Sequence, residues 1–395
     1  MPKRILLLTF FYPPDLSAGS FRAEALVKAL RNHADVGMQI DVLTTQPNRY
    51  HSHASEAPEV ESLDGVRIRR VPLPGHQSGF VDQAKAFTAF AWQAAKLAQA
   101  EHYDLVIATS SRLMTAVLGT WVAQRQKAKL YLDLRDIFVE NLGELFRPLI
   151  SRPLRFVFGL LERWAVRRAD KVNLVTPGFL GYFQPKYPKQ QFSLHTNGVD
   201  DDFVASLPAM PARHHADPIR VLYAGNIGDG QGLHLILPAL AARLAGKVHF
   251  QIVGAGGRLR LLQETLKSEN VDNVELIAPV PRVRLMEMYK QADVLFLHLN
   301  DFEAFRRVLP SKLFEYAATG RPIWAGGAGY AATFIDEEVS NAAVFAPCQV
   351  DEAIQAFGRL AIESTTRTTF IERYARRRIM DAMARDVLAL IEDGV

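Results

Sequence analysis

Short apolar runs alternate with amphipathic segments along most of this 395-residue chain. Twelve of these runs are rich in Val, Ile and Leu and fit strands that are buried on both faces. They cover residues 4–10, 39–45, 66–72, 104–110, 129–135, 171–176, 219–225, 248–254, 274–280, 293–299, 321–327 and 342–347. Segments with helical spacing lie between many of them, including 21–34, 83–99, 258–269 and 311–320. This alternation predicts an α/β fold with two parallel sheets in tandem.

Turn formers and prolines separate the two series near residues 197–218, where NGV, a DDD run and LPAMPARHHADP follow one another. We therefore expect an N-terminal domain at 1–198 and a C-terminal domain at 199–372, each large enough for its own core. The chain from about residue 351 is helical in pattern and rich in arginine. Residues 373–395 are expected to form a C-terminal helix, and its packing back onto the N-terminal domain is left open.

The composition is that of an ordinary soluble protein, with 49% hydrophobic and 22% charged residues. No apolar run approaches the roughly 20 residues that a spanning helix requires. Lys3 and Arg4 before ILLLTFFY imitate a secretory signal, but YPPD ends this run early, so we expect a buried first strand. The single cysteine, Cys348, excludes an internal disulfide framework and favours a cytoplasmic location.

The charge is distributed unevenly between the two halves. Residues 1–198 hold 25 Lys and Arg against 17 Asp and Glu, a net charge of +8, whereas residues 199–395 hold 21 against 25, a net charge of −4. The basic excess is greatest at 145–171, where seven basic residues alternate with large apolar ones: Arg147, Arg152, Arg155, Arg163, Arg167, Arg168 and Lys171. Two interpretations stay open, a helix lying peripherally on the anionic inner face of the membrane and a packed helix with a solvated basic face. Nucleic acid is a poorer partner, because the second half is acidic and carries no binding signature.

The stretch YAGNIGDGQGLH, residues 223–234, places four glycines within eight positions after an apolar run. It is not a phosphate-binding P-loop, because Gln231 and Gly232 stand where that loop has Lys and Ser or Thr. It also lacks the G-x-G-x-x-G spacing of a dinucleotide site. Bare backbone between a strand end and a helix start favours a phosphate or diphosphate, with a purely structural turn as the alternative.

Several motifs in order resemble the retaining glycosyltransferases of family 4: YPPDLSAGSFRAEAL, TNGVDDDF, the glycine stretch at 223–234, GAGG at 254–257 and LPSKLFEYAATGRPI from Leu309. The resemblance implies the GT-B fold, in which two Rossmann-like domains face each other across a cleft. GNIG and QGL followed by SKLFEYAATGRP resemble the subgroup that builds bacterial surface polysaccharides such as O-antigen. The resemblance further implies that the donor substrate is a nucleotide sugar, a UDP-sugar, and that no cofactor is needed. The acceptor that it implies is a polyprenyl-diphosphate-linked or a free saccharide.

Carried over residue by residue, the resemblance assigns the donor side to the C-terminal domain. Glu315 is expected to bond the ribose hydroxyls, since a carboxylate accepts two hydrogen bonds from a diol. The backbone N–H groups of Ser311, Lys312 and Leu313 and the Lys312 ammonium are expected to meet the diphosphate. The remaining donor-binding positions are Gly225, Asn226, Gly228, Gln231, Gly232 and Gly254.

This sequence departs from the family at two places. Arg307 stands where the family often has a glutamate that contacts the transferred sugar. Asn226 and Gln231 replace a basic pair in the glycine loop. The diphosphate charge must then be met by other cations, and Arg306, Arg307 and Lys312 are the candidates, with Lys312 and Arg307 placed among the catalytic residues.

The acceptor side is expected in the N-terminal domain. The turn SAGS resembles the family's glycine loop and assigns Gly19, Ser20 and Arg22 to the acceptor side. Asp136 occupies the place of a residue that faces the reacting sugar, where a carboxylate could hold the sugar or stabilise oxocarbenium charge. A structural ion pair with Arg135, or a helix cap, is the alternative for Asp136.

No metal is expected at the site. Asp200, Asp201 and Asp202 contain a D-x-D, but adjacent side chains in a turn need not converge on one ion, and the His51/His53 and His214/His215 pairs lack further ligands. The function expected is metal-independent, retaining transfer of a hexosyl or N-acetylhexosaminyl group. Two alternatives remain: a nucleotide-sugar 2-epimerase and a non-catalytic carbohydrate- or membrane-binding relative of the same fold.

Overall fold

The computed structural model describes residues 2–15, 17–35, 37–47, 57–74, 80–110, 112–145, 148–204 and 217–392. The two histidine pairs and residues 146 and 147 of the basic stretch therefore lie outside the described residues. The chain forms two compact units. Unit 1 comprises Met1–Asn197 and Arg376–Val395, and unit 2 comprises Gly198–Ala375.

Unit 1 contains an eight-stranded sheet in the order β3-β4-β2-β1-β5-β6-β7-β8. All neighbouring strands are parallel except β3, which is antiparallel to β4. The strands are β1 (Arg4–Leu8), β2 (Gln39–Thr45), β3 (Val60–Leu63), β4 (Val66–Val71), β5 (Leu105–Ser110), β6 (Lys129–Leu134), β7 (Lys171–Leu174) and β8 (Phe192–Ser193). Ile5 to Leu8 are fully buried, so the apolar run near the N-terminus is the buried strand that the sequence predicts.

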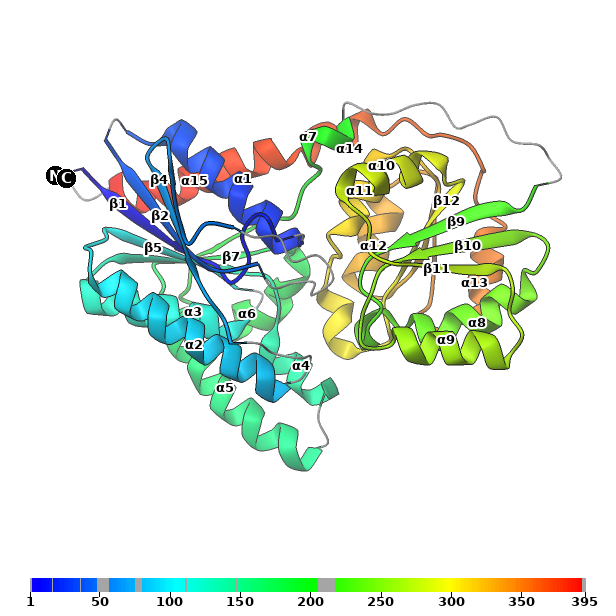
Figure 1. The fold of residues 1–395 in the computed structure, drawn as a ribbon, viewed down its shortest axis with the longest axis horizontal. Helices are drawn as coiled ribbons and strands as arrows, with labels where there is room; N and C mark the ends of the chain where they lie inside the picture. The colour runs from blue at the N-terminus through cyan, green and yellow to red at the C-terminus, as the bar shows by residue number, and fades with distance from the viewer. Residues whose placement is uncertain are drawn as a thin grey trace. The chain divides into compact units, whose positions relative to one another are not determined.

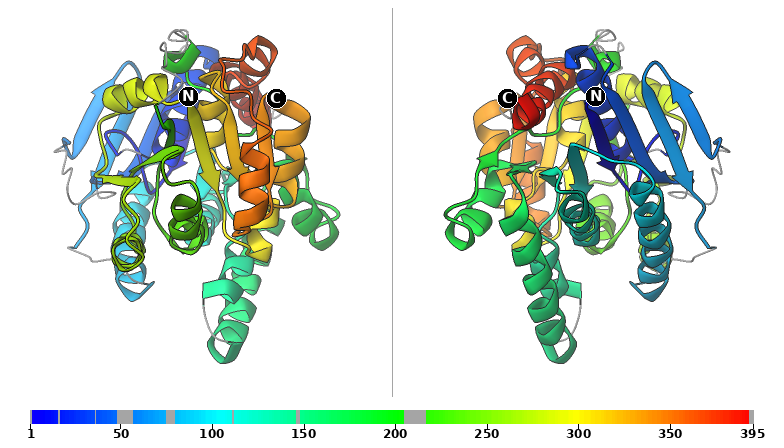
Figure 2. Two further views of the ribbon diagram at one scale, coloured as in Figure 1. Left: turned by 90° about the vertical axis from the view of Figure 1, so that its right-hand side faces the viewer. Right: turned by 90° about the vertical axis from the view of Figure 1, so that its left-hand side faces the viewer.

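Helices cover both faces of this sheet (Figure 1). They are α1 (Ala18–His33), α2 (Phe80–Gln99), α3 (Leu113–Gln126), α4 (Phe138–Leu145), α5 (Pro148–Arg168), α6 (Leu180–Lys186) and α15 (Arg376–Glu392), with the short helix η2 (Pro177–Phe179) before α6. The last helix, α15, packs beside α1, where Met383 and Val387 share a core with Leu26 and Leu30. The helices α2 and α3 lie on the opposite face of the sheet (Figures 1 and 2).

Unit 2 contains a six-stranded, wholly parallel sheet in the order β11-β10-β9-β12-β13-β14. The strands are β9 (Ile219–Ala224), β10 (Val248–Val253), β11 (Val274–Ile277), β12 (Val294–His298), β13 (Ile323–Gly326) and β14 (Ala342–Phe345). The helices are α7 (Asp201–Val204), η3 (Asp229–Gln231), α8 (Leu233–Arg243), α9 (Leu259–Ser268), α10 (Arg282–Gln291), η4 (Glu303–Arg307), α11 (Lys312–Ala318), α12 (Tyr330–Glu338), α13 (Val350–Phe357) and α14 (Thr368–Arg373). One core on each face, around Trp324 and around Phe314, holds the helices to the sheet.

The predicted α/β fold with parallel sheets is confirmed, since each of the twelve apolar runs contains a strand. Two strands were not predicted. β3 is largely exposed, and β8 has only two residues, so neither has the apolar pattern of a buried strand. Within the described residues, no helix has both the length and the hydropathy to span a bilayer.

A buried ion pair joins α1 to the middle of the unit 1 sheet. Arg22 donates from Nε and Nη2 to the two carboxylate oxygens of Asp133, both at 2.9 Å, and each residue is 1% exposed. The same guanidinium donates to the carbonyls of His195 and Thr196, both at 2.7 Å. Burial opposes ionisation of Asp133, but the Arg22 charge and the Asn173 amide outweigh it, so the pKa of Asp133 is lowered. Every nitrogen of Arg22 is thus bonded within unit 1, which gives it a structural role, and its assignment to the acceptor side stays a prediction.

Arg22→Ala is expected to lower the free energy of unfolding by about 3 to 5 kcal/mol, because it leaves the Asp133 charge buried without its cation. The double variant R22M/D133L should lose less, since it removes both charges. Arg31→Ala on the exposed face of the same helix, where Arg31 pairs with exposed Asp64, serves as the control and should cost under about 1 kcal/mol. Urea unfolding measures all three. An Arg22→Ala midpoint equal to that of the wild type would show that the ion pair does not stabilise unit 1.

Candidate active site

Two glycine-containing loops lie next to each other at the carboxyl ends of β9 and β10. Gly225 follows β9 with φ +145°, and Gly254 follows β10 with φ +155°, conformations that side chains rarely adopt. A Cβ on Gly254 would overlap the carbonyl oxygen of Gly225, so the two loops can approach this closely because Gly254 has no side chain. The predicted glycine positions therefore lie together at the sheet edge where α/β proteins bind ligands.

A lysine ammonium lies against this backbone. Lys312 begins α11, and its Nζ lies 3.9 Å from the centroid of the Tyr223 ring. A Cβ on Gly225 would lie only 2.5 Å from this Nζ. Nζ is buried and has no hydrogen-bond partner among the described residues. Burial lowers the pKa of Lys312 to about 7, although the negative charge of Glu315 opposes the shift. The loop thus holds a buried lysine Nζ that makes no hydrogen bond among the described residues, with Glu315 as a nearby negative charge.

The polar side chains of the glycine loop bond to each other. Asn226 Nδ2 donates to Gln231 Oε1 at 2.8 Å, and the Gly228 N–H donates to the same oxygen at 3.3 Å. The Tyr223 hydroxyl donates to the carbonyl of Asn226 at 2.6 Å. These bonds shape the turn, so Asn226 and Gln231 have a structural explanation beside the expected donor contact.

Two buried residues that the sequence did not single out support the loop from β12. His298 Nδ1 bonds the carbonyl of Gln231 at 2.7 Å, and its Nε2 accepts from the N–H of Cys348 at 3.0 Å. Burial lowers the pKa of His298 to about 4, which keeps the ring neutral with the proton on Nδ1. Asn300 donates to the carbonyl of Asp229 at 2.9 Å, and Gly232, at φ +60°, packs against its side chain. The sequence signal that could have revealed His298 and Asn300 is their position as polar residues at the end of an apolar strand.

Glu315 lies half-buried on α11, one turn after Lys312. The hydroxyl of buried Tyr289 donates to its Oε2 at 3.4 Å, which orients the carboxylate. Ser311 is half-buried just before the helix. Leu313 differs from expectation, because it is fully buried in the core and its N–H donates to the carbonyl of Pro310 at 3.1 Å. Leu313 therefore offers no N–H to a diphosphate in this structure.

The two arginines before α11 are placed differently from Lys312. Arg306 pairs with Asp301 at 3.3 Å and with Glu303 at 3.2 Å, all of them exposed. Arg307 is half-buried at the end of η4. Of the three expected cations, Lys312 is the one that lies against Gly225.

In unit 1, the end of β6 carries Arg135 and Asp136, both half-buried. Burial raises the pKa of Asp136 to about 6, and the Arg135 charge opposes the shift. Among the described residues Asp136 has no hydrogen bond, and its interaction with Arg135 is electrostatic, so both expectations for Asp136 stay open. A Cβ on Gly19 would overlap Nη1 of Arg135, which explains the glycine at the start of α1. Ser20 is fully buried, and its N–H donates to Ser17 Oγ at 3.2 Å.

The candidate metal ligands of the sequence do not come together in the described residues. No group of three or more His, Cys, Asp or Glu side chains in the described ranges is placed to hold a metal ion. Asp200, the first residue of the D-x-D, pairs with Arg282 at 2.6 Å.

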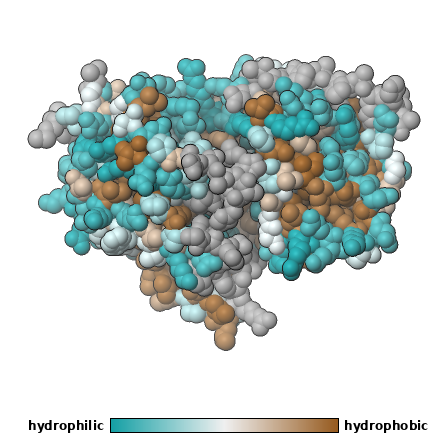
Figure 3. Space-filling view, viewed as in Figure 1, coloured by the Kyte–Doolittle hydropathy of each residue, from teal (hydrophilic) through white to brown (hydrophobic). Residues whose placement is uncertain are grey.

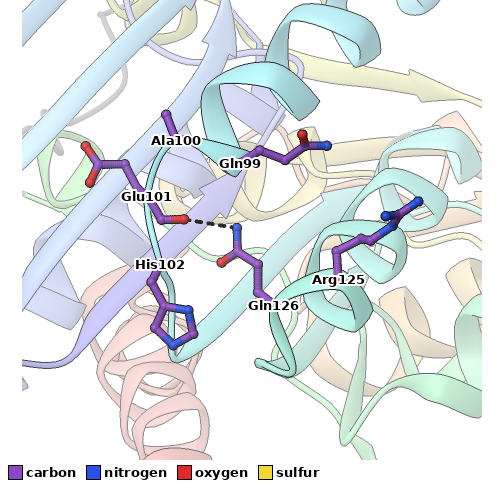
Figure 4. A pocket seen from close by; sticks show the side chains of 6 residues that line it. All are labelled: Gln99, Ala100, Glu101, His102, Arg125 and Gln126. Atoms are coloured by element: carbon purple, nitrogen blue, oxygen red, sulfur yellow. Dashed lines mark hydrogen bonds between the residues drawn. The ribbon is translucent and has the colours of Figure 1, made fainter.

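A hollow at the ends of α2 and α3 is lined by Gln99, Ala100, Glu101, His102, Arg125 and Gln126 (Figure 4). Gln126 is engaged there in bonds to the backbone of Tyr103 and Ala98, and the hollow lies at the amino ends of β5 and β6.

Comparisons with known proteins agree with this fold. A family model described as "Glycosyl transferase 4-like domain" matches residues 19–198, and one described as "Glycosyl transferases group 1" matches residues 211–378. No curated protein sequence matches the chain significantly.

Three solved structures illustrate the similarity. Sucrose-phosphate synthase (tll1590) from Thermosynechococcus elongatus is 17% identical with a TM-score of 0.74, over 99% of this chain and 100% of that one. Anabaena Alr3699/HepE in complex with UDP and glucose is 15% identical with a TM-score of 0.67, over 98% and 100%. WaaG, a glycosyltransferase involved in lipopolysaccharide biosynthesis, is 13% identical with a TM-score of 0.64, over 96% and 95%. The comparisons favour neither the epimerase nor the non-catalytic alternative. The chain therefore belongs to the GT-B glycosyltransferases, with a glycosyl transferase 4-like domain followed by a group 1 domain.

Proposed function

We propose that the protein transfers a hexosyl or N-acetylhexosaminyl group from a UDP-sugar to a lipid-linked or saccharide acceptor, with retention at the anomeric carbon and without a metal ion. The acceptor would be a polyprenyl-diphosphate-linked saccharide in bacterial surface polysaccharide synthesis. The observation that carries this proposal is the buried Lys312 ammonium, which lies against Gly225 and has no hydrogen-bond partner among the described residues. The similar Anabaena protein was solved in complex with UDP and glucose, which supports a nucleotide sugar as the donor of this protein.

In this proposal the donor diphosphate meets the Lys312 ammonium beside the bare backbone of Gly225 and Gly254. No side chain can stand between the ammonium and the phosphate, because a Cβ on Gly225 would already contact Nζ. A phosphate would supply the missing counter-charge and raise the pKa of the lysine again. Lys312 also takes the role of the absent basic pair, since Asn226 and Gln231 are engaged in shaping the turn.

Glu315 binds the ribose in this scheme. Its carboxylate lies on the same helix as Lys312, one turn further on, so one short helix would address both the phosphate and the ribose of the donor. The Tyr289 hydroxyl holds one carboxylate oxygen and leaves acceptor capacity for the two ribose hydroxyls.

The proposed reaction breaks the bond between the anomeric carbon and the diphosphate oxygen and forms a bond to the acceptor oxygen on the same face. The acceptor proton passes to the departing phosphate oxygen, so no separate base is required. Charge on the leaving diphosphate grows as the bond breaks, and Lys312 stabilises it there. Asp136 is assigned to the positive charge that develops on the sugar, which requires its ionised form.

Changes at Lys312 and Glu315 should separate turnover from donor binding. Lys312→Met is expected to lower kcat about 100-fold, the usual cost of losing one group that stabilises the leaving charge. Glu315→Ala should leave kcat nearly unchanged and raise the donor KM by roughly 10- to 100-fold, the equivalent of a charged hydrogen bond of about 1.5 to 3 kcal/mol.

Release of UDP from a panel of UDP-sugars measures both variants, with exposed Lys247→Met as the control. The anomeric configuration of the product, read by NMR, tests retention. A product of inverted configuration, or a Lys312→Met enzyme with wild-type turnover, would contradict the proposal.

The pH dependence of kcat/KM should be bell-shaped with a narrow optimum. Activity should rise through about pH 6 as Asp136 ionises and fall above about pH 7 as Lys312 loses its proton. Asp136→Asn is expected to lower the activity and to abolish the rise on the acidic side. If the acidic limb persists unchanged in Asp136→Asn, the role assigned to this carboxylate is wrong.

A further inference from the structure

The helix α5 exposes a continuous apolar stripe. Leu149, Phe156 and Leu160 follow helical spacing on one face and are 90%, 69% and 49% exposed. Ile150 and Val157, one heptad apart, lie beside them and are 52% and 51% exposed. Single exposed apolar residues are common on soluble proteins, but five in register on one helix are the pattern of an interaction surface.

The carboxyl-terminal half of α5 is packed against unit 1 through Glu162, Ala165 and Val166, so the helix that carries the stripe is anchored in the fold. Phe158 packs edge-on against Phe138 of α4, with the ring centroids 5.1 Å apart. Near the end of the helix, buried Glu162 accepts hydrogen bonds from the hydroxyls of Tyr182 at 3.2 Å and Tyr187 at 2.9 Å. Figures 1 and 2 show the amino-terminal half of α5 projecting beyond the other helices on its face of the sheet. Figure 3 shows hydrophobic atoms at this projecting end.

The charges on α5 are nearly all positive. Its one acidic residue, Glu162, is buried in the tyrosine cluster, whereas five arginines are exposed: Arg152, Arg155, Arg163, Arg167 and Arg168. Arg152 and Arg163 border the stripe, and Arg167 and Arg168 end the helix. Any partner of this surface must therefore offer apolar contact and negative charge together.

We propose that the α5 stripe inserts into the interface of an anionic lipid bilayer, with the arginines at the level of the lipid phosphates. A bilayer accepts apolar side chains between its headgroups, and long basic side chains reach its phosphates from the same helix. A second copy fits less well, because a two-fold pairing would place the arginines that border one stripe beside those that border the other. The link to a lipid-linked acceptor rests on the proposed function, but bilayer binding itself does not.

Insertion differs from purely electrostatic attachment in its response to salt. The Debye length falls to roughly 3 Å at 1 M salt, which screens the arginines. Burial of the apolar stripe in the interface is not screened. Binding should therefore weaken with salt and retain a salt-resistant part, whereas a solvated basic face would release the membrane completely.

Sedimentation with phosphatidylglycerol–phosphatidylethanolamine vesicles tests this proposal in the full-length protein at 0.1 M and 1 M NaCl, with phosphatidylcholine vesicles for comparison. The variant L149Q/F156Q/L160Q should bind at least tenfold more weakly and lose the part that resists salt. The variant R152E/R155E/R163E should lose the salt-sensitive part. Leu235→Gln and Leu261→Gln, exposed residues of unit 2, serve as matched controls and should bind like the wild type.

A tryptophan in place of Phe156 reports insertion directly, through a blue shift and quenching by brominated lipid. Circular dichroism and thermal unfolding check that each variant folds. The proposal is overturned if the wild type ignores anionic vesicles at 0.1 M NaCl, or if the glutamine variant binds like the wild type. It is also overturned if the stripe instead joins two copies, seen as a lipid-free dimer that L149Q/F156Q/L160Q converts to a monomer. UDP release is measured in parallel, so a loss of membrane binding with normal UDP release contradicts only this proposal.

Discussion

Within the part of the chain that the structure describes, the Lys312 ammonium lies against Gly225 without a hydrogen-bond partner, and its neighbours are arranged around it. Gly225 can carry no side chain, Gly254 must be bare to let the second loop approach, and the Tyr223 ring covers the ammonium from one side. Burial without a hydrogen-bond partner disfavours the charged form of Lys312, which is why its pKa falls although the Glu315 charge opposes the shift. A ligand that brings two phosphate charges turns this cost into binding free energy. Under the proposed function, the donor diphosphate is the ligand that completes this loop.

Unit 1 buries charge in two ways, as an ion pair between Arg22 and Asp133 and as a single carboxylate at Asp136. Arg22 and Asp133 are paired through two hydrogen bonds, and the Arg22 guanidinium also donates to the backbone carbonyls of His195 and Thr196. Asp136, only three residues after Asp133, is half-buried with no hydrogen bond among the described residues, and burial raises its pKa to about 6 against the opposing charge of Arg135. Paired buried charges hold the fold together, whereas unpaired ones mark the positions where chemistry is expected.

The fold followed from the sequence because buried parallel strands read as short apolar runs, and glycines located the loop at the end of β9. Local pattern could not separate structural from functional charge. The sequence assigned Arg22 to the acceptor side and gave no sign of its pairing with Asp133, which lies 111 residues away in the chain. His298 and Asn300 act on the loop from another strand, so no spacing revealed them. For the stretch at 145–171 the sequence could not distinguish a membrane-surface helix from a packed helix with a solvated basic face. The structure adds that apolar side chains such as Phe156 are exposed there.

Proton uptake on donor binding tests the central claim about Lys312 most directly. UDP-glucose is a suitable probe, because its diphosphate stays fully ionised across the neutral range. At pH 8 most of the buried lysine is neutral in the free protein, and a bound diphosphate should recharge it. Calorimetry in buffers of different ionisation enthalpy should then show uptake of protons, up to one per site, that disappears in Lys312→Met. Binding of UDP-glucose without any buffer dependence, or with the same uptake in Lys312→Met, would contradict the account.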